Sequence, residues 1–478
     1  MPGAGLYSAD VRVEAVVPVE DVPMSSTRGP GHGVTLREAT RVWAYIGLNS
    51  FGGPAGQIAV MHRELVERRR WVSERRFLHA LNYCMILPGP EAQQLATYVG
   101  WLMHGTRGGV VAGSLFVIPG FFAMLVLSAV YAVFGDVTWI QGLLFGLQAA
   151  VVAIVVEAVI RIGKRTLRSH ALQVIAALSF VAIAFFDVPF PFIIIAAALA
   201  GWLIGRRRPG WFPLGGHRGA SDIDEPPALL PDDEAISKPA ARSALRAAAV
   251  CAVIWLIPVI ALVFTLGMAN VFAQEAVLFS QSALVTFGGA YAVLAFIAQE
   301  AVYRYGWITP QDMITGLGLA ETTPGPLIMV VQFVGFLAAY NSPGDLPPLV
   351  AGTLGAILTV WVTFVPCFMF IFLGAPYVER LRHNESLSHA LTAVGAAVSG
   401  VVLDLALWFA LHTAFGTVTD TSFGPLTLPI PELGTINLAA VAISLLAAVL
   451  VFRLRIGTLK VLGTCAAVGA AVTLFGWS

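Results

Sequence analysis

The chain of 478 residues is 57% hydrophobic and 12% charged, and its 28 basic residues balance its 28 acidic ones. Soluble domains carry charge on about 25% of their residues, so this chain cannot cover its apolar surface in water. A neutral chain without a basic stripe is not expected to bind nucleic acid. The 4 cysteines lie singly in apolar stretches, which predicts no disulfide framework, no metal site and no cofactor.

Residues 1–35 lack a basic start followed by an apolar run, so we expect a disordered cytoplasmic leader and not a cleaved signal. A full crossing of a bilayer needs about 20 apolar residues. Thirteen stretches that can enter a bilayer lie near 41–61, 77–103, 109–134, 138–160, 171–186, 189–205, 244–266, 279–301, 308–340, 349–374, 387–412, 435–453 and 456–476. The sequence therefore predicts an all-α polytopic membrane protein.

The second half of the chain repeats the first. A constant shift in residue number lays 49–90 on 285–326 without a gap, and 12 of these 42 positions are identical. Further on, an insertion in the second half increases the difference in residue number between equivalent positions. Pro119 then aligns with Pro366, and Glu157 aligns with Asp404. We predict these units: an N-terminal membrane repeat (36–205), a cytoplasmic linker (206–243), an inverting transmembrane helix (244–266) and a C-terminal membrane repeat (267–478).

The single extra crossing at 244–266 places the two repeats upside down relative to one another. Inverted repeats are typical of secondary transporters, whose substrate site lies near the membrane midplane where the halves meet. Positively charged loops stay in the cytoplasm. If 41–61, 77–103, 279–301 and 308–340 are re-entrant, nine crossings remain, and of 28 Lys and Arg only Arg304 lies outside. Full crossing by broken helices is the alternative, and both arrangements keep the repeats inverted.

Glycine and proline interrupt these four segments at membrane depth. Gly52-Gly53-Pro54 and Gly288-Gly289 break the first segment of each repeat, and two Pro-Gly-Pro turns break the second. Non-helical backbone at this depth is tolerated where protein or a watery cavity satisfies it, so either a kinked packing helix or a functional break explains one copy. Two copies in register favour a functional break.

A helix that begins after each turn presents unpaired N–H groups and a positive dipole end, which bind oxyanions without a buried lysine. We therefore predict an anion site at the repeat interface. Its expected residues are Asn49, Gly52, Gly53, Pro88, Gly89, Pro90, Gln93 and Gln94 in the first repeat, with Gly288, Gly289, Thr322, Thr323, Pro324, Gly325 and Pro326 in the second.

Charged residues near these turns have two interpretations each. Glu321 and Glu91 are candidates for proton coupling, because acidic residues inside membranes are costly, but helix capping or pairing explains them equally well. A cytoplasmic cluster of arginines either gathers anions or only fixes the topology; its members are Arg63, Arg68, Arg69 and Arg70. Glu64 and Glu300 each precede an arginine by four positions, which predicts helical ion pairs.

These motifs together resemble the chromate ion transporter family in its long, two-domain form. The likeness is carried by Phe51-Gly52-Gly53-Pro54, the run from His62 to Ser73, Leu87-Pro88-Gly89-Pro90, Phe287-Gly288-Gly289 and the run from Glu321 to Pro326. It departs from the family pattern at Glu91, where small residues are common, and at Ala290, where proline would follow the glycines.

The resemblance implies a bacterial inner-membrane protein, with halves of opposite orientation, that exports chromate and confers resistance to it. We therefore expect a secondary transporter and not an enzyme, with chromate or a related oxyanion as substrate, protons as a candidate coupling ion and the lipid bilayer as its surroundings. The alternative is a carrier of sulfate or another oxyanion. A chromate reductase would need redox ligands or thiol pairs, and a scaffold gains nothing from repeated helix breaks.

Overall fold

The computed structural model describes residues 33–212, 228–230, 238–287, 289–377 and 385–476. Residues 1–32 of the predicted leader, most of the predicted linker and Gly288 lie outside the described residues. Nearly all of the described chain is helical, and the prediction of an all-α polytopic membrane protein built from two repeats is confirmed.

The first repeat begins with short helices separated by breaks and continues with long ones. Its elements are α1 (Leu36–Asn49), α2 (Gly53–His62), the π-helix η1 (Arg63–Arg68), α3 (Glu74–Cys84), α4 (Glu91–Phe134), α5 (Thr138–Thr166), α6 (His170–Phe186), α7 (Phe190–Arg207) and the short 3-10 helix η2 (Pro209–Trp211). The long helix α8 (Lys238–Leu266) then connects to the second repeat.

The second repeat follows the same order of elements. They are α9 (Val271–Val285), α10 (Ala290–Ala298), the π-helix η3 (Gln299–Arg304), α11 (Pro310–Thr322), η4 (Leu327–Met329), α12 (Val330–Asn341), α13 (Pro348–Gly374), η5 (Ala375–Tyr377), α15 (Glu385–Ala414), β1 (Val418–Phe423), β2 (Leu426–Pro431), η6 (Leu433–Thr435), α16 (Leu438–Ala448), the π-helix η7 (Val449–Arg453) and α17 (Thr458–Leu474). The shift that lays 49–90 on 285–326 also carries η1 onto η3, position by position.

Helix α4 is a hairpin of two helices. Its backbone leaves helical geometry at His104 and Gly105. In a continuous helix, Gly100 and Gly108 would lie about 12 Å apart. Here a Cβ built on Gly108 would lie 2.2 Å from the Gly100 carbonyl oxygen, so the chain has folded back on itself. In the second repeat, α12 and α13 form the same hairpin with a longer connection between them.

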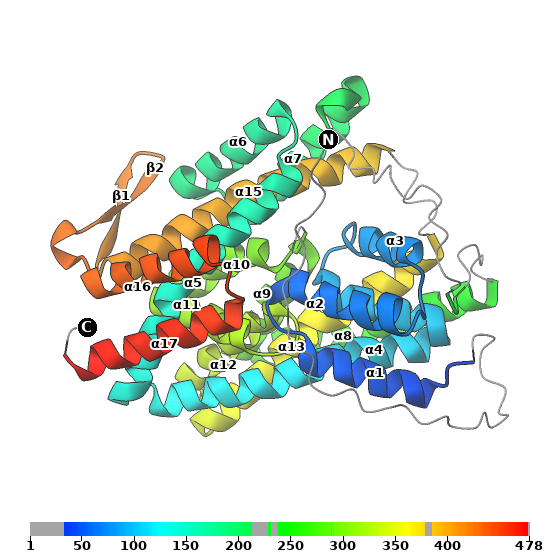
Figure 1. The fold of residues 1–478 in the computed structure, drawn as a ribbon, viewed down its shortest axis with the longest axis horizontal. Coiled ribbons are helices and arrows are strands. Elements are labelled where there is room, and N and C mark those ends of the chain that lie inside the picture. The colour runs from blue at the N-terminus through cyan, green and yellow to red at the C-terminus, as the bar shows by residue number, and fades with distance from the viewer. Residues whose placement is uncertain (1–32, 213–227, 231–237, 288, 378–384, 477–478) are drawn as a thin grey trace, which may run out of the picture.

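A β-hairpin is the element that the sequence analysis did not predict. β1 and β2 pair antiparallel with Phe423 opposite Leu426, so a two-residue turn of Gly424 and Pro425 joins them. Gly424 has a left-handed φ of 67°, which glycine adopts readily and which tight hairpin turns require. The hairpin lies between α15 and α16, where the first repeat joins α5 to α6 directly, and it projects at one end of the molecule (Figure 1).

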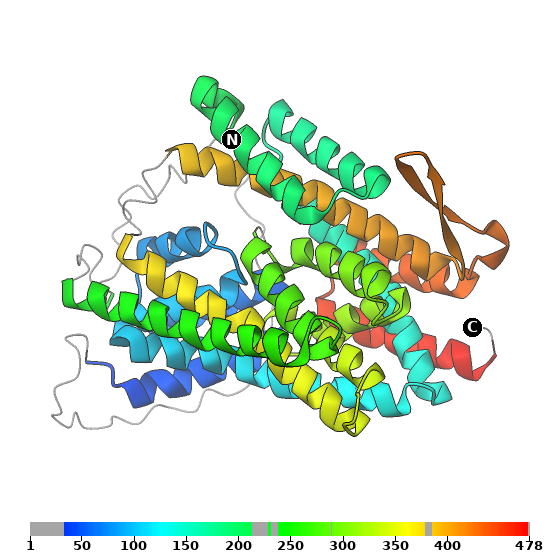
Figure 2. The ribbon, with the colours of Figure 1, turned by 180° about the vertical axis from the view of Figure 1, so that it is seen from behind.

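The two repeats are interlocked. α5 of the first repeat packs against α16 and α17 of the second, whereas α15 of the second packs against α6 and α7 of the first. Small residues allow the close crossings: a Cβ on Gly469 would lie 2.5 Å from Gly146 Cα, and one on Gly201 would lie 2.6 Å from Ala393 Cβ. The short helices α9 to α12 lie in the middle of the molecule, and α8 lies along its rear beside α13 (Figures 1 and 2).

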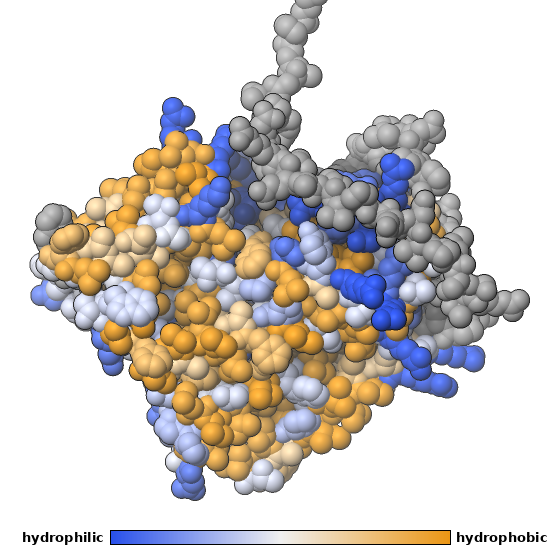
Figure 3. Space-filling model, turned by 60° about the horizontal axis from the view of Figure 1, so that its bottom comes forward, coloured by the Kyte–Doolittle hydropathy of each residue, from blue (hydrophilic) through white to orange (hydrophobic). Residues whose placement is uncertain are grey.

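The outside of the molecule is suited to lipid. Among the described residues, six helices are long and apolar enough to cross a membrane: Glu91–Phe134, Thr138–Thr166, Phe190–Arg207, Ala241–Leu266, Pro348–Tyr377 and Glu385–Ala414. Large apolar side chains point outward from them, and Phe264 of α8 is 85% exposed. Hydrophobic residues cover most of the face shown in Figure 3, and the strongly hydrophilic ones gather at its edges. This distribution matches a bilayer environment.

Candidate functional site

The helix breaks of the two repeats meet at the centre and exchange hydrogen bonds. Gly89, in the first Pro-Gly-Pro turn, donates its N–H to the Thr286 carbonyl oxygen at 2.8 Å. Gly325, in the second turn, donates its N–H to the Ser50 carbonyl oxygen at 2.9 Å. The alignment of the two repeats carries one bond onto the other. Each Pro-Gly-Pro turn therefore pairs with the glycine break of the opposite repeat.

The two turn glycines are held in conformations that other residues rarely adopt. Gly89 has φ of 130° and Gly325 has φ of 92°. A Cβ on Gly89 would also lie 2.9 Å from Cys367 Sγ of α13. Beside the second turn, a Cβ on Gly120 of α4 would lie 2.5 Å from the Pro324 carbonyl oxygen. The junction is therefore closely packed backbone, and glycine is required where the two turns pass their neighbours.

Helix N-termini gather at this junction. α2 begins at Gly53 and α4 at Glu91, each directly after a break. In the second repeat α10 begins at Ala290 and the helical segment of η4 and α12 begins at Leu327. The first N–H groups of a helix have no acceptor within it and carry its positive dipole end. Breaks that meet therefore bring several positive helix ends to one place.

Two buried glutamines lie in the first turn of α4. The Gln94 amide donates to the Pro88 carbonyl oxygen at 2.6 Å, and the Gln93 amide donates to Thr97 Oγ1 at 3.1 Å. Neither side-chain oxygen has a hydrogen-bond partner among the described residues. Unpaired buried polar atoms are costly. The junction therefore contains two hydrogen-bond acceptors that the fold itself does not use.

Three other predicted side chains bond locally. The Asn49 amide donates to the Tyr45 carbonyl oxygen at 2.8 Å and stays exposed on α1. The hydroxyls of Thr322 and Thr323 donate to carbonyl oxygens of their own helix, at 2.7 Å and 3.0 Å. The backbone of these two threonines lies at the second Pro-Gly-Pro turn, but their hydroxyl protons already make hydrogen bonds within the helix. Of the predicted glycines, Gly89 and Gly325 bond the opposite repeat at the junction, and Gly288 lies outside the described residues.

Glu321 is buried at the junction and is held by a residue that the sequence analysis missed. Its Oε1 accepts a hydrogen bond from the Tyr291 hydroxyl at 2.5 Å. A Cβ on Gly53 would lie 4.0 Å from its Oε2, so the carboxyl reaches the break of the opposite repeat. Arg161 of α5 lies near enough to act on it electrostatically. Tyr291 itself carried no local sequence signal, because it is one aromatic residue in an apolar segment.

The first repeat contributes two further polar residues to the junction, Gln57 and Glu91, but lacks the Tyr291–Glu321 pair of the second repeat. Gln57 of α2 donates its amide to the Gly325 carbonyl oxygen at 2.6 Å, a second bond that ties the opposite turn to the first repeat. Glu91 is the half-buried first residue of α4, with Arg165 as the cation that acts on it electrostatically. The first repeat has Ala55 and Met85 at the positions of Tyr291 and Glu321. The second repeat alone therefore carries this pair.

The predicted arginine cluster lies on exposed positions of the segment between α2 and α3. Glu64 is buried and accepts from Arg68 at 2.8 Å, and Arg69 lies 3.8 Å from its other oxygen. The equivalent pair, Glu300 with Arg304, is 2.7 Å apart, so both predicted ion pairs are confirmed.

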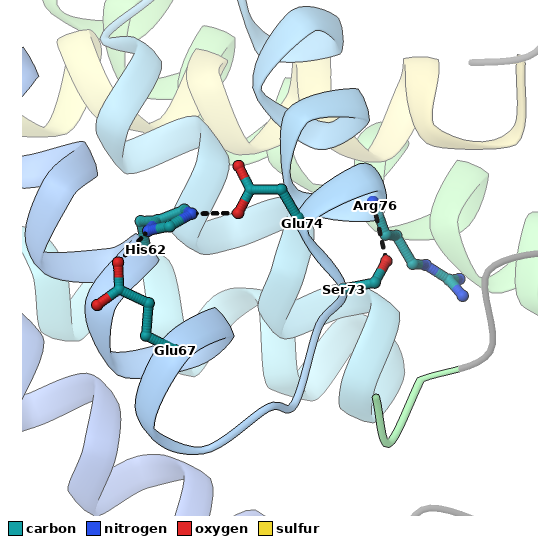
Figure 4. Close-up of polar contacts among 5 residues, drawn as sticks. All are labelled: His62, Glu67, Ser73, Glu74 and Arg76. Atoms are coloured by element: carbon teal, nitrogen blue, oxygen red, sulfur yellow. Dashed lines mark hydrogen bonds and ion pairs between the residues drawn. The ribbon is translucent and has the colours of Figure 1, made fainter. Parts of the chain in front are cut away.

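His62 lies between Glu67 and Glu74, and Ser73 caps the first turn of α3 at the Arg76 N–H (Figure 4). These contacts fix the fold of the segment between α2 and α3, on which Arg63 and Arg70 are also exposed. The cluster is therefore presented on an ordered surface.

A polar cavity of about 410 Å³ lies between α4, α5, α11 and α12. Asp312 lines it and accepts hydrogen bonds from Tyr131 and from the backbone and hydroxyl of Thr309. Gln148 also lines it and donates to Thr315 Oγ1 at 2.8 Å. In the first repeat, Arg76 stands at the position of Asp312. The equivalent parts of the two repeats therefore carry opposite charge.

Comparison with known proteins gives the chain its family. A family described as "Chromate transporter" matches residues 37–202 and 273–470. A "Chromate transport protein" of Pseudomonas aeruginosa is 34% identical over 364 residues, which cover 74% of this chain and 76% of that protein. A "Chromate transport protein" of Cupriavidus metallidurans is 27% identical over 369 residues, covering 77% and 81%. No solved structure matches the chain significantly.

A shorter relative corresponds to one repeat. An uncharacterized transporter of Bacillus subtilis is 30% identical over 160 residues, which are 33% of this chain but 90% of that protein. The family region is also matched twice, once in each repeat. Two repeats, broken helices and apolar spans thus agree with the comparisons: the chain belongs to the chromate transporter family and is a multi-pass protein of the bacterial inner membrane.

Proposed function

We propose that this protein exports chromate across the inner membrane and so confers resistance to it. The observation that carries the proposal is the reciprocal junction, in which the Pro-Gly-Pro turn of each repeat bonds the break of the other and helix N-termini gather. Peptide N–H groups and helix dipoles hold a tetrahedral dianion without a buried cation. Neutral donors also let the anion leave again.

Transport by this arrangement proceeds by alternating access. The dianion enters from the cytoplasmic side, is held between the opposed helix ends and leaves outside as the repeats rock against each other. The potential favours this direction: expelling a doubly charged anion from a negative cytoplasm gains about 4.6 kcal/mol per 100 mV, which is twice the value for one charge. Export therefore needs no other energy source.

The charge at the two sides fits the same route. The arginines between α2 and α3 concentrate anions at the cytoplasmic mouth, since a cluster of one sign raises the local concentration of the opposite ion. The cavity beside Asp312 serves as the outer vestibule, where a carboxylate disfavours rebinding of the released dianion.

Proton coupling is an addition to this cycle, and Glu321 and Glu91 are its candidates at the junction. Glu321 bonds Tyr291 and lies against the first-repeat break, so a dianion at the helix ends would repel its ionised form. Protonation of Glu321 on anion binding removes that repulsion. Glu91, at the first residue of α4, competes for the same helix end and is neutralised in the occupied state.

Chromate accumulation by everted membrane vesicles tests the proposal. With a potential imposed, vesicles that contain the protein should accumulate chromate, and the Pro324→Ala variant should do so much more slowly because its turn no longer fixes the helix end. The Glu321→Gln variant should bind chromate with altered affinity while it still transports. Growth on chromate should follow the same order. Accumulation no faster than in vesicles without the protein would exclude the function.

Sulfate is the alternative substrate, because it has the same shape and charge as chromate. Competition in the same vesicles separates the two. A chromate exporter should lose little of its chromate uptake at an equal concentration of sulfate, whereas a sulfate carrier should lose most of it.

A further inference from the structure

Glu275 is a buried carboxyl that the anion route does not use. It lies in α9, in the second turn after the N-cap Asn270, and its exposed fraction is 0%. Neither of its carboxyl oxygens has a hydrogen-bond partner among the described residues. An isolated ionised carboxylate is strongly disfavoured in such surroundings, so the group is neutral unless a cation joins it.

Within the part of the chain that the structure describes, the helices packed against α9 bring no charged partner to Glu275. α9 packs against α8, α10, α12 and α13. The sequences of α10, α12 and α13 contain no Asp, Glu, Lys, Arg or His, and their titratable groups are Tyr291, Tyr340 and Cys367. The last charged residue of α8, Arg246, is about 30 Å along that helix from the end that leads to α9.

The Glu275 carboxyl lies against the α12–α13 hairpin. A Cβ on Gly355 would lie 3.1 Å from Glu275 Oε1 and 2.6 Å from the Gly335 carbonyl oxygen. Thr359 Oγ1 also lies against Gly335 and has no partner among the described residues. Backbone this close leaves no room for a metal ion with six ligands. A proton needs no such space.

The first repeat shows that the fold does not require a carboxyl here. Ala39 occupies the position of Glu275 and is buried where α1 packs against α4. A methyl group therefore satisfies the equivalent packing. Burial of an unpaired acid costs stability that an alanine would not cost, so packing alone does not account for Glu275.

We propose that Glu275 is a proton-binding site that couples anion export to the proton gradient. The proposal rests on the proposed function. The carboxyl binds a proton from the outer side while α9 is packed against the α12–α13 hairpin, as in this structure. When the hairpin moves in the transport cycle, water reaches the group, and the acid dissociates into a carboxylate and a proton that leaves to the cytoplasmic side. One proton enters as the dianion leaves.

Purified protein in liposomes, held at a fixed membrane potential, tests this site. For one proton exchanged per anion, a gradient of one pH unit should change the accumulation ratio of chromate about tenfold. The Glu275→Gln variant keeps the shape and loses the exchangeable proton, so its accumulation ratio should not respond to the gradient. Glu300→Gln, which alters a partly buried carboxyl that is paired with Arg304, is the matched control and should respond like the unmodified protein.

The outcomes separate the two proposals. A Glu275→Gln variant that responds to the pH gradient, or an unmodified protein that does not, overturns the proton site while chromate transport itself stands. Absence of transport by the unmodified protein overturns the proposed function instead. Infrared spectra then still test proton binding: the carbonyl band of buried protonated carboxyls should lose intensity in Glu275→Gln relative to the unmodified protein, and an unchanged band contradicts the site.

Discussion

Ser50 and Thr286 occupy equivalent positions in the two repeats. The carbonyl oxygen of each accepts a hydrogen bond from a turn glycine of the opposite repeat. The sequence could predict that these glycines and prolines break helices at membrane depth, because φ and the missing donor are properties of the residue itself. It could not predict which break meets which. That pairing depends on how the repeats interlock. Gln57, which bonds the turn of the opposite repeat, and Tyr291, which bonds Glu321 of its own repeat, carried no local signal.

Substitution of Gly325 tests the junction at the residue scale. Gly325→Ala places a Cβ at a φ of 92° and 3.2 Å from the Phe116 carbonyl oxygen, so it should cost about 1–3 kcal/mol of stability and shift the Ser50 bond. A displaced helix end should slow chromate transport about tenfold or more. Thermal unfolding and vesicle uptake measure the two effects.

Gly344 provides the control for backbone strain alone. It also has a left-handed φ, of 60°, but nothing lies within 4 Å of a Cβ built there, and it is exposed in the connection between α12 and α13. Gly344→Ala should lose stability and keep transport. If Gly325→Ala transports as well as Gly344→Ala, the junction does not position the anion.

At the scale of elements, the repeat in the sequence predicted more than the hydropathy did. The alignment of the two halves anticipated equivalent helices, ion pairs and turns, and the structure adds that both Arg68 and Arg304 end a π-helix. The β-hairpin was missed because it has no counterpart in the first repeat. The hairpin within α4 was expected only as two separate apolar segments, since hydropathy does not reveal that Gly100 and Gly108 touch.

The crossing of α5 and α17 predicts the effect of a larger side chain. A Cβ on Gly469 would lie 2.5 Å from both Gly146 N and Gly146 Cα, and backbone cannot move aside as a side chain can. Gly469→Leu should therefore destabilise the protein by about 1–3 kcal/mol, seen as a lower unfolding temperature in detergent. Gly463→Leu, exposed on the same helix with nothing within 4 Å, should leave it unchanged; equal losses in both variants would refute the close crossing.

At the scale of the whole molecule, the two repeats share the larger of the hydrophobic cores. α5 packs with helices of the second repeat and α15 with helices of the first, so neither repeat carries a complete set of helix contacts alone. The sequence predicted inversion from the single extra helix and the placement of arginines. It could not predict the interlocking, which depends on contacts between residues far apart in the chain.

Opposite orientation of the repeats is the claim on which the transport account depends, and cysteine labelling measures it directly. Arg75 and Gln311 are exposed and occupy equivalent positions in the alignment of the two repeats, and the 4 native cysteines are buried, so background labelling should be low. In intact cells, an impermeant thiol reagent should label Gln311→Cys and not Arg75→Cys; in everted vesicles the pattern should reverse. Labelling of both positions from the same side would contradict the inverted arrangement.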